Sequence, residues 1–271
     1  MKPPRADIAA PPFPPGTEWV GGAEPRLDRL VATGPLLVHF FDLAQLNCAR
    51  AMPYVEAWAE RYGGARLSVL GVHSARYGFT DRAELVADSL PRLGIEWPVA
   101  VDSRHAIWRA YGCRGWPSLF LWGRGGALRW YHLGEGDYEQ TELAIREALE
   151  ETDGSLGSWP ETLSPLRAGD EPGARVMPPT PELLPGGSPD QPWAGGSLEV
   201  PYEAGGAFLA ADGEGEVAVS LDGEGRKPVE IDRPGLHPVA VHERHESHRL
   251  ELEPGPGVEI YSVQFAPAPP A

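Results

Sequence analysis

The sequence predicts an α/β domain followed by an all-β sandwich domain. Apolar runs of strand length alternate with segments of helical periodicity between residues 34 and 151. A segment rich in proline and glycine ends this alternation, and from Ser197 onward apolar residues recur at every second position, the period of a half-buried strand. The predicted parts are a Pro-rich segment at 1–16, the α/β domain at 17–151, a connector at 152–195, the β-sandwich at 196–266 and a tail at 267–271.

The elements of the first domain follow one another in the order βαβαβαββα, which predicts helices packed on a mixed sheet. Residues 36–41 form a continuous apolar run, typical of a buried strand. Helical spacing of apolar residues follows over 47–62, with Asn47 as a suitable N-cap and Pro53 as the expected position of a kink. The other predicted elements are strands at 67–72, 97–101, 119–122 and 128–133 and helices at 80–93, 103–111 and 137–151.

The second domain is predicted to contain seven short strands. Turn pairs such as Asp222-Gly223 and Pro254-Gly255 separate its alternating segments, a spacing typical of a β-sandwich. The connector before it is too apolar for a free linker, so we expect it to pack on one or both domains. The first 16 residues are expected to be extended or disordered. The predicted strands are 198–202, 207–211, 216–221, 228–231, 237–242, 248–253 and 258–265.

The charge and composition of the chain exclude several classes of partner. The formal net charge is −16, and residues 153–271 carry 20 acidic and 7 basic groups. Nucleic acids and anionic membranes select basic surfaces, so neither is an expected partner. No run approaches the ~20 apolar residues of a membrane span, and the first 15 residues lack the apolar region of a secretory signal. Two cysteines without an export signal predict free thiols in a reducing, cytoplasmic location.

Several dispersed segments carry a family pattern. They are Leu36-Leu37-Val38-His39-Phe40-Phe41, Asn47-Cys48-Ala49-Arg50-Ala51-Met52-Pro53-Tyr54, Val69-Leu70-Gly71-Val72-His73, Ala106-Ile107-Trp108-Arg109-Ala110-Tyr111-Gly112 and Gly115-Trp116-Pro117-Ser118. Together with residues 131–136, they resemble the thioredoxin-like domain of TlpA- and DipZ-type thiol-disulfide oxidoreductases over roughly 16–151. Segments 180–183, 217–223 and 258–265 are similar to the carbohydrate-binding-module-like β-sandwich that follows this domain in DipZ-type proteins.

The resemblance implies two cysteines separated by two residues at the start of the first long helix, and this chain departs from that pattern. Gln45 stands at the position of the family's nucleophilic cysteine, and Cys48 holds the second position. His39 stands where thioredoxins usually keep a buried acid beneath the active site. The sequence also lacks the membrane-spanning domain of full DipZ proteins.

Cys48 admits two interpretations. Disulfide exchange needs one sulfur to attack and a second to resolve the mixed disulfide. A lone Cys48 therefore predicts loss of dithiol exchange, with the thiol kept as a small buried residue. The alternative is a single-cysteine enzyme, either a thiol-disulfide oxidoreductase or a peroxidase in which Gln45 and Arg50 orient peroxide near Cys48. Cys113 is expected to be a core residue, with a disulfide to Cys48 as the alternative.

A binding groove is implied beside the same motif. Trp116-Pro117 resembles the cis-proline turn that faces the active site in thioredoxins and pairs with the backbone of an extended peptide. The resemblance therefore implies that Leu46, Trp116 and Pro117 line a groove that binds protein or peptide without chemistry. Leu46 and Trp116 would form an exposed apolar patch there. The alternative is a turn with structural value only.

The histidines are interpreted as structural residues. His39 and His73 lie on or just after apolar strands, which predicts satisfied core side chains. His242, His245 and His248 are spaced three apart, which tempts a zinc interpretation. On a strand or turn that spacing does not gather all three on one face, so a solvated turn is favoured and no metal site is predicted.

The acidic sandwich offers two further possibilities. Acidic residues between 212 and 224 are interpreted as loop charges rather than calcium ligands. Trp193, Tyr202 and Tyr261 are candidate stacking surfaces for carbohydrate. No phosphate loop or dinucleotide fingerprint is present in the sequence, so no cofactor is predicted.

The sequence thus predicts a degenerate thioredoxin-like protein that has lost dithiol-disulfide exchange and binds or scaffolds a protein or peptide. The first alternative is the single-cysteine oxidoreductase or peroxidase using Cys48. The second is carbohydrate binding through the C-terminal sandwich.

Overall fold

The computed structural model describes residues 1–3, 8–153 and 159–271 of the chain. Its contacts divide the chain into two compact units, and short pieces of the first half of the sequence are assigned to the second unit. Unit 1 comprises Met1–Leu43, Asn47–Ala75 and Arg82–Ser164, and unit 2 comprises Ala44–Leu46, Arg76–Asp81 and Pro165–Ala271. Among the described residues, no helix is both long and apolar enough to cross a membrane.

Unit 1 is built on a mixed sheet of six strands in the order β1-β4-β3-β2-β5-β6. β2, β3 and β4 run parallel, whereas β1, β5 and β6 are antiparallel to the neighbours they pair with. Parallel neighbours require long crossover connections, and helices supply them. The strands are β1 (Glu18–Val20), β2 (Leu36–Phe41), β3 (Ser68–His73), β4 (Val99–Val101), β5 (Ser118–Trp122) and β6 (Leu128–Leu133).

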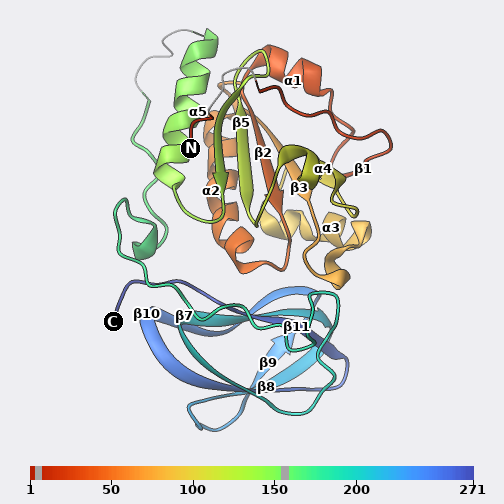
Figure 1. Ribbon diagram of the computed structural model, residues 1–271, viewed down its shortest axis with the longest axis vertical. Coiled ribbons are helices and arrows are strands. Elements are labelled where there is room, and N and C mark those ends of the chain that lie inside the picture. Colours follow the sequence, from red (N-terminus) through yellow and green to blue (C-terminus); the bar gives the residue numbers. More distant parts are fainter. Residues whose placement is uncertain (4–7, 154–158) are drawn as a thin grey trace. The chain divides into compact units, whose positions relative to one another are not determined.

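Helices cover both faces of this sheet (Figure 1). Alternate residues of β2 point to opposite faces. Leu36, Val38 and Phe40 join one apolar cluster with Ile107 and Tyr111 of α4, and α1 packs at its edge. The opposite face lies toward α2 and α5. The helices are α1 (Leu27–Thr33), α2 (Leu46–Gly63), α3 (Ala83–Ser89), α4 (Ala106–Tyr111) and α5 (Tyr138–Asp153).

The α/β prediction for the first domain is confirmed, and the differences are local. β2 has the predicted bounds, because a continuous apolar run leaves no choice of register. The predicted helix at 80–93 is instead three short pieces, with α3 between single 3₁₀ turns at Gly78–Thr80 and Pro91–Leu93. α2 begins at Leu46, so Asn47 lies inside the helix rather than at its cap.

Two elements before residue 34 were not predicted. β1 has only three residues, and α1 has seven residues of which none is buried. Neither is long enough to show a clear hydrophobic period, and both depend on contacts with the rest of unit 1. β1 pairs with β4, and Leu30 of α1 packs against the core cluster.

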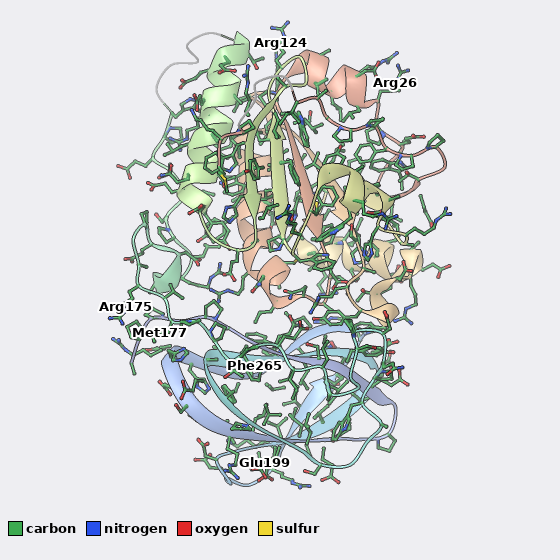
Figure 2. The ribbon with its side chains drawn as sticks, viewed as in Figure 1. Arg26, Arg124, Arg175, Met177, Glu199 and Phe265 are labelled. Carbon is green, nitrogen blue, oxygen red and sulfur yellow. The ribbon has the colours of Figure 1, made fainter. Side chains whose placement is uncertain are left out.

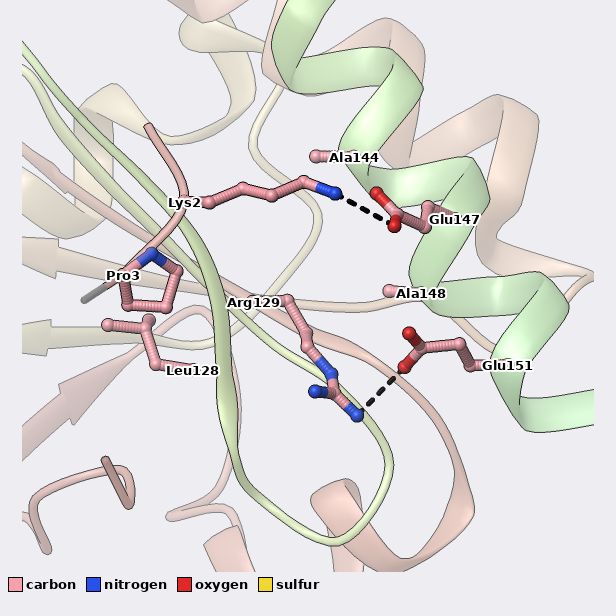
Figure 3. Close-up of a pocket in the computed structure, with 8 residues that line it drawn as sticks. All are labelled: Lys2, Pro3, Leu128, Arg129, Ala144, Glu147, Ala148 and Glu151. Atoms are coloured by element: carbon pink, nitrogen blue, oxygen red, sulfur yellow. Dashed lines mark hydrogen bonds and ion pairs between the residues drawn. The ribbon is translucent and has the colours of Figure 1, made fainter. Parts of the chain in front are cut away.

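The described residues of the N-terminal segment pack on unit 1 in an extended form. The Leu128 N–H donates to the Ile8 carbonyl at 2.8 Å, and the Tyr111 hydroxyl donates to the Pro11 carbonyl at 3.0 Å. Lys2 forms an ion pair with Glu147 of α5 at 2.9 Å, at the rim of a surface pocket of about 180 Å³ (Figure 3). Of the two expectations for 1–16, the extended one holds for the described residues.

Unit 2 contains an antiparallel sheet of five strands in the order β11-β7-β10-β8-β9. The prediction of seven strands is wrong, because two predicted pairs of strands are each one long strand. Predicted strands 198–202 and 207–211 are parts of β7, and 237–242 and 248–253 are parts of β10. The strands are β7 (Leu198–Gly213), β8 (Gly215–Leu221), β9 (Lys227–Ile231), β10 (Gly235–Pro254) and β11 (Val258–Phe265).

Bends in the two long strands explain this difference. Gly206 of β7 has φ +153°, a conformation that residues with a Cβ rarely adopt. β10 carries register shifts between Pro238 and Ala240 and between Val241 and Glu246, and such bulges bend a strand without ending it. Both halves of β7 and β10 contribute to one apolar core, which is the arrangement of a β-sandwich. The fold class predicted for the second domain is therefore confirmed.

The segment before β7 has little regular structure, but its described residues are bonded to their own unit. In unit 1, the Leu163 N–H donates to a Glu142 carboxylate oxygen at 2.8 Å. In unit 2, the Met177 N–H donates to Ala268, and Leu183 forms a bridge with Val263 of β11 (Figure 2 labels Met177). The expectation that this segment packs rather than hangs free is confirmed for these residues.

Candidate functional site

The candidate site lies where β2 ends and α2 begins. Ligand sites of sheets with parallel strands usually form beyond the carboxyl ends of those strands. Gln45 is half-buried in this connection. Cys48 follows in the first turn of α2, with only 1% of its surface exposed. The Asp42 backbone N–H donates a hydrogen bond to Cys48 Sγ at 3.4 Å. The motif therefore holds one sulfur, and that sulfur faces the interior.

Within unit 2, the side chain of Gln264 forms hydrogen bonds with the backbone groups on either side of Gln45. The Leu46 N–H donates to Oε1 of Gln264 at 2.7 Å, and Nε2 of Gln264 donates to the Ala44 carbonyl at 2.8 Å. Gln264 itself is buried. The first N–H groups of a helix lack partners in the helix and attract anions such as a thiolate. Here one of them is already bonded to a neutral amide.

Gln264 was not identified from the sequence, where it is one of several residues in an alternating strand. It is separated from Leu46 by 218 positions. A glutamine between the apolar residues Val263 and Phe265 was the available signal, since a buried polar side chain requires a partner.

His73 and His39 occupy different environments near the site. His73 is buried, and its Nε2 accepts the Leu43 backbone N–H at 3.4 Å. His39 is fully buried in β2, but neither ring nitrogen has a hydrogen-bond partner among the described residues. Burial lowers the pKa of His39 to about 3, so its ring is neutral at physiological pH. The prediction that His39 is satisfied is therefore wrong.

The turn at Trp116 is rigidly held within unit 1. The Trp116–Pro117 peptide bond is cis. Trp116 Nε1 donates to the Ser74 carbonyl at 2.8 Å, and the indole stacks on Trp108 with ring centroids 4.2 Å apart. Trp116 is half-buried and Pro117 is buried.

The expectation of an exposed apolar patch is wrong for Leu46, whose exposed fraction is 3%. In the described structure Leu46 contributes its backbone N–H to the Gln264 contact rather than a side chain to solvent. Trp116 is the most accessible of the three residues predicted to line the groove. Binding of a protein or peptide at Trp116 stays a prediction.

Arg50, which the peroxidase alternative assigned to orienting peroxide, is paired with an acidic side chain. Its guanidinium forms an ion pair with Glu135, and both side chains are largely buried. The positive charge that would orient peroxide in that alternative is therefore already balanced by Glu135.

Cys113 is also inaccessible. It lies in the apolar cluster between β2 and α4, and burial raises the pKa of its thiol to about 12 despite a hydrogen bond with Ser118. Both cysteines are free, so the disulfide alternative is not realised. Both thiols are therefore buried.

Two of the three aromatic residues proposed for sugar stacking are buried. Tyr202 is 3% exposed and Tyr261 is 7% exposed, so neither offers a face to a glycan. Trp193 is half-buried, and its backbone N–H donates to the Ile260 carbonyl at 2.8 Å.

The interpretation of the sandwich histidines needs a correction. His242 and His248 were expected in a solvated turn, but their rings stack with centroids 4.2 Å apart. Glu246 lies beside them, and the three residues form a cluster with the spacing of metal ligands. His245 is not part of that cluster.

Comparison with known proteins supports a relationship over the first half of the chain. A stretch of 114 residues is 38% identical to Protein DipZ of Mycobacterium tuberculosis (strain CDC 1551 / Oshkosh) and covers 42% of this chain but 16% of DipZ. A stretch of 135 residues is 27% identical to the thiol-disulfide oxidoreductase YkuV of Bacillus subtilis (strain 168) and covers 50% of this chain and 90% of YkuV. No family model matches the chain.

The chain is also similar to a solved structure. The solution structure of a thioredoxin-like protein in the oxidized form is 26% identical and covers 54% of this chain and 97% of that protein, with a TM-score of 0.49.

Proposed function

We propose that this chain, whose N-terminal domain belongs to the TlpA/DipZ-type thioredoxin-like family, has lost dithiol-disulfide exchange and acts as a binding or scaffold protein. The observation that carries the proposal is the motif Gln45 to Cys48, in which the first sulfur is absent and the second is 1% exposed. We also propose a reducing, cytoplasmic location, in which the two free thiols stay reduced.

Disulfide exchange requires two successive attacks. One thiolate attacks a substrate disulfide, releases one substrate sulfur as a thiolate and forms a mixed disulfide. A second thiolate then attacks that bond, takes the place of the substrate and frees its remaining sulfur. The carboxamide of Gln45 performs neither step. Cys48 is buried, and the Cys113 thiol is protonated at neutral pH because its pKa is about 12.

The surroundings of the motif support the same proposal. In active members of such a family, helix N–H groups lower the pKa of the attacking thiol. In unit 2 the Leu46 N–H donates to Gln264 instead, in a contact that an amide satisfies without charge. A site adapted to a thiolate would not need that neutral partner.

Trp116 is the residue we propose for partner contact. A half-exposed indole fixed by a hydrogen bond and by stacking loses little conformational entropy when a partner binds. We propose a protein or an extended peptide as the partner, since the turn is the one that meets peptide backbone in the family it resembles. Carbohydrate is not favoured as the partner, because Tyr202 and Tyr261, two of the proposed stacking residues, are buried.

The first test measures reductase turnover. The purified chain is expected to reduce insulin disulfides with dithiothreitol no faster than dithiothreitol alone, and Cys48→Ser is expected to change nothing. Turnover above background that disappears in Cys48→Ser would overturn the proposal and favour the single-cysteine enzyme. Gln45→Cys tests whether the rest of the site is competent, with Gln264→Ala added to free the Leu46 N–H.

The second test measures binding. A library of extended peptides is screened against the intact protein, and the affinity of the selected peptides is compared between variants. We expect Trp116→Ala to weaken binding by at least about tenfold, which corresponds to a loss of about 1.4 kcal/mol. Cys48→Ser is expected to bind normally. Trp159→Ala is the matched control, because Trp159 is also half-buried and hydrogen-bonded through Nε1. Equal losses in the two tryptophan variants would contradict the proposed role of Trp116.

A further inference from the structure

The bulge in β10 gathers three potential metal ligands in unit 2. Val241 pairs with Gly206 of β7, and Glu246 pairs with Ala204, so five steps along β10 match two along β7. A regular strand rises about 3.3 Å per residue and would separate His242 from His248 by roughly 20 Å. In the bulged strand the two rings stack with centroids 4.2 Å apart. The bulge therefore brings together two side chains that a regular strand would keep far apart.

The three side chains offer a donor set suited to a transition metal. One nitrogen of His242, one of His248 and one carboxylate oxygen of Glu246 all lie within 4.8 Å of one another. Two imidazoles and a carboxylate are ligands that zinc and its neighbours prefer, whereas magnesium and calcium prefer oxygen atoms alone. His242 and His248 are half-buried and Glu246 is exposed, so an ion can reach the cluster and keep water in a remaining position.

Two further residues lie within hydrogen-bond distance of the imidazoles. Asp222 Oδ2 lies 2.6 Å from Nδ1 of His248, and Asp222 Oδ1 accepts the Arg249 backbone N–H at 2.7 Å. The Tyr202 hydroxyl lies 2.8 Å from Nε2 of His242. A carboxylate on the far nitrogen of a histidine orients the ring and makes its other nitrogen a better ligand, as in many metal sites. Nε2 of His248 accordingly points at Glu246, 3.2 Å away.

We propose that His242, Glu246 and His248 form a binding site for one divalent transition-metal ion of the zinc class, with Asp222 and Tyr202 as positioning residues. The site is independent of the thiol motif and of the partner role proposed for Trp116. A bound ion would hold the bulged segment of β10 against the turn that carries Asp222.

The test uses the full-length protein after treatment with a chelator. Titration calorimetry with Zn²⁺ is expected to show saturable binding of one ion, and Co²⁺ is expected to give the visible absorption of a site with nitrogen ligands. Asp222→Asn should weaken Zn²⁺ binding by about 10–100-fold, the loss typical of removing an outer partner. His242→Ala, His248→Ala and Glu246→Gln should weaken it further. Excess Mg²⁺ should not compete.

His245→Ala is the matched control, since His245 lies in the same bulge but outside the cluster. It should bind Zn²⁺ as the unmodified protein does. Zn²⁺ should also raise the unfolding temperature of the unmodified protein and of His245→Ala, but not of His248→Ala. Absence of saturable binding, or equal losses in His245→Ala and His248→Ala, would overturn the proposal. Circular dichroism of each variant distinguishes loss of the site from loss of the fold.

Discussion

His39 lies in the middle of β2, between Gly71 of β3 and Leu119 of β5, with its ring stacked on Phe41. No described group pairs with its nitrogens, and burial lowers its pKa to about 3. A buried group of this kind favours the folded state only while it is neutral. In the unfolded chain it takes up a proton below its ordinary pKa of about 6.5.

This difference predicts a pH dependence of stability. Between pH 6.5 and about 3 the unfolded state binds a proton that the folded state does not, so the free energy of unfolding falls as the pH is lowered. At full effect the loss is about 1.4 kcal/mol per pH unit, or roughly 2 kcal/mol at pH 5. His39→Leu should remove this loss. The measurement is denaturant unfolding followed by tryptophan fluorescence, which reports unit 1 because Trp193 is the one tryptophan outside it. Parallel pH profiles for the two proteins would contradict the prediction.

The two thiols predict a simple reactivity pattern. Cys48 is 1% exposed, and Cys113 is 8% exposed with a pKa of about 12. A thiol reagent at neutral pH should label both slowly in the native protein and should label two thiols quickly in denaturant. Cys113→Ser isolates Cys48 in the same assay. Fast native labelling of that variant would show a reactive Cys48 and would support the single-cysteine enzyme.

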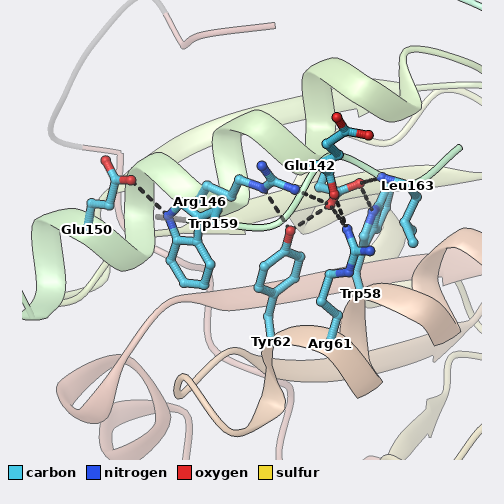
Figure 4. Close-up of polar contacts among 9 residues, drawn as sticks. Trp58, Arg61, Tyr62, Glu142, Arg146, Glu150, Trp159 and Leu163 are labelled. Carbon is cyan, nitrogen blue, oxygen red and sulfur yellow. Dashed lines mark hydrogen bonds and ion pairs between the residues drawn. The ribbon is translucent and has the colours of Figure 1, made fainter. Parts of the chain in front are cut away.

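At the scale of elements, α2 and α5 are joined by a buried carboxylate. Glu142 of α5 accepts hydrogen bonds from the Tyr62 hydroxyl at 2.5 Å and from Arg61 and Arg146 at 2.9 Å (Figure 4). Leu163, after α5, donates its backbone N–H to the same carboxylate. Burial raises the pKa of Glu142, but these hydrogen bonds outweigh it and hold the pKa below its usual value. The cluster ties two helices and the following segment into one unit.

Glu142→Gln should therefore destabilise unit 1. Its amide keeps the shape but loses the charge and one acceptor, and a loss of about 1–3 kcal/mol is typical of leaving buried donors unsatisfied. Glu147→Gln is the matched control on the same helix, where an exposed pair with Lys2 contributes little. It should change the free energy of unfolding by no more than about 0.5 kcal/mol.

The contribution of Glu142 should also depend on pH. A carboxylate with a lowered folded pKa stabilises the fold above its unfolded pKa, and that stability is lost as the pH falls through the folded value. The loss begins below about pH 4.3, whereas the loss predicted for His39 already begins below about pH 6.5. Equal destabilisation by Glu142→Gln at neutral and strongly acidic pH would contradict this assignment.

At the scale of the molecule, the described residues between α5 and β7, 159–197, belong to the folded units. In unit 2 its backbone is bonded at Met177, Thr180, Leu183 and Trp193 to strands β7 and β11 or the residues just after β11. We expect the amide hydrogens of these four residues to exchange with solvent much more slowly than in the denatured chain. The measurement is native-state hydrogen exchange on the full-length protein. Exchange at the rate of the denatured chain would show that the segment is a free linker.

The sequence predicted elements with strong local periods and missed those that depend on distant partners. β2 and the hairpin of β5 and β6 were recovered because each strand is marked by its own side chains. β7 and β10 were each predicted as two strands, because the glycines of β7 and the polar run of β10 are typical of turns. The pairing of β7 with β10 continues on both sides of these residues. Strand periodicity argued against a cluster of His242, His245 and His248, and the irregular register of β10 brings two of them, His242 and His248, together.

The sequence by itself determined which atoms are present for chemistry. It has Gln45 where a sulfur is expected, two cysteines in all and an acidic second half, and no packing alters those facts. Only the tertiary structure decided that Cys48 is buried, that Gln264 bonds Leu46 from 218 positions away and that His242 meets His248. The physical reason is range, because backbone preferences act over a few residues. Side chains far apart in sequence meet only when burial of the core brings their elements together.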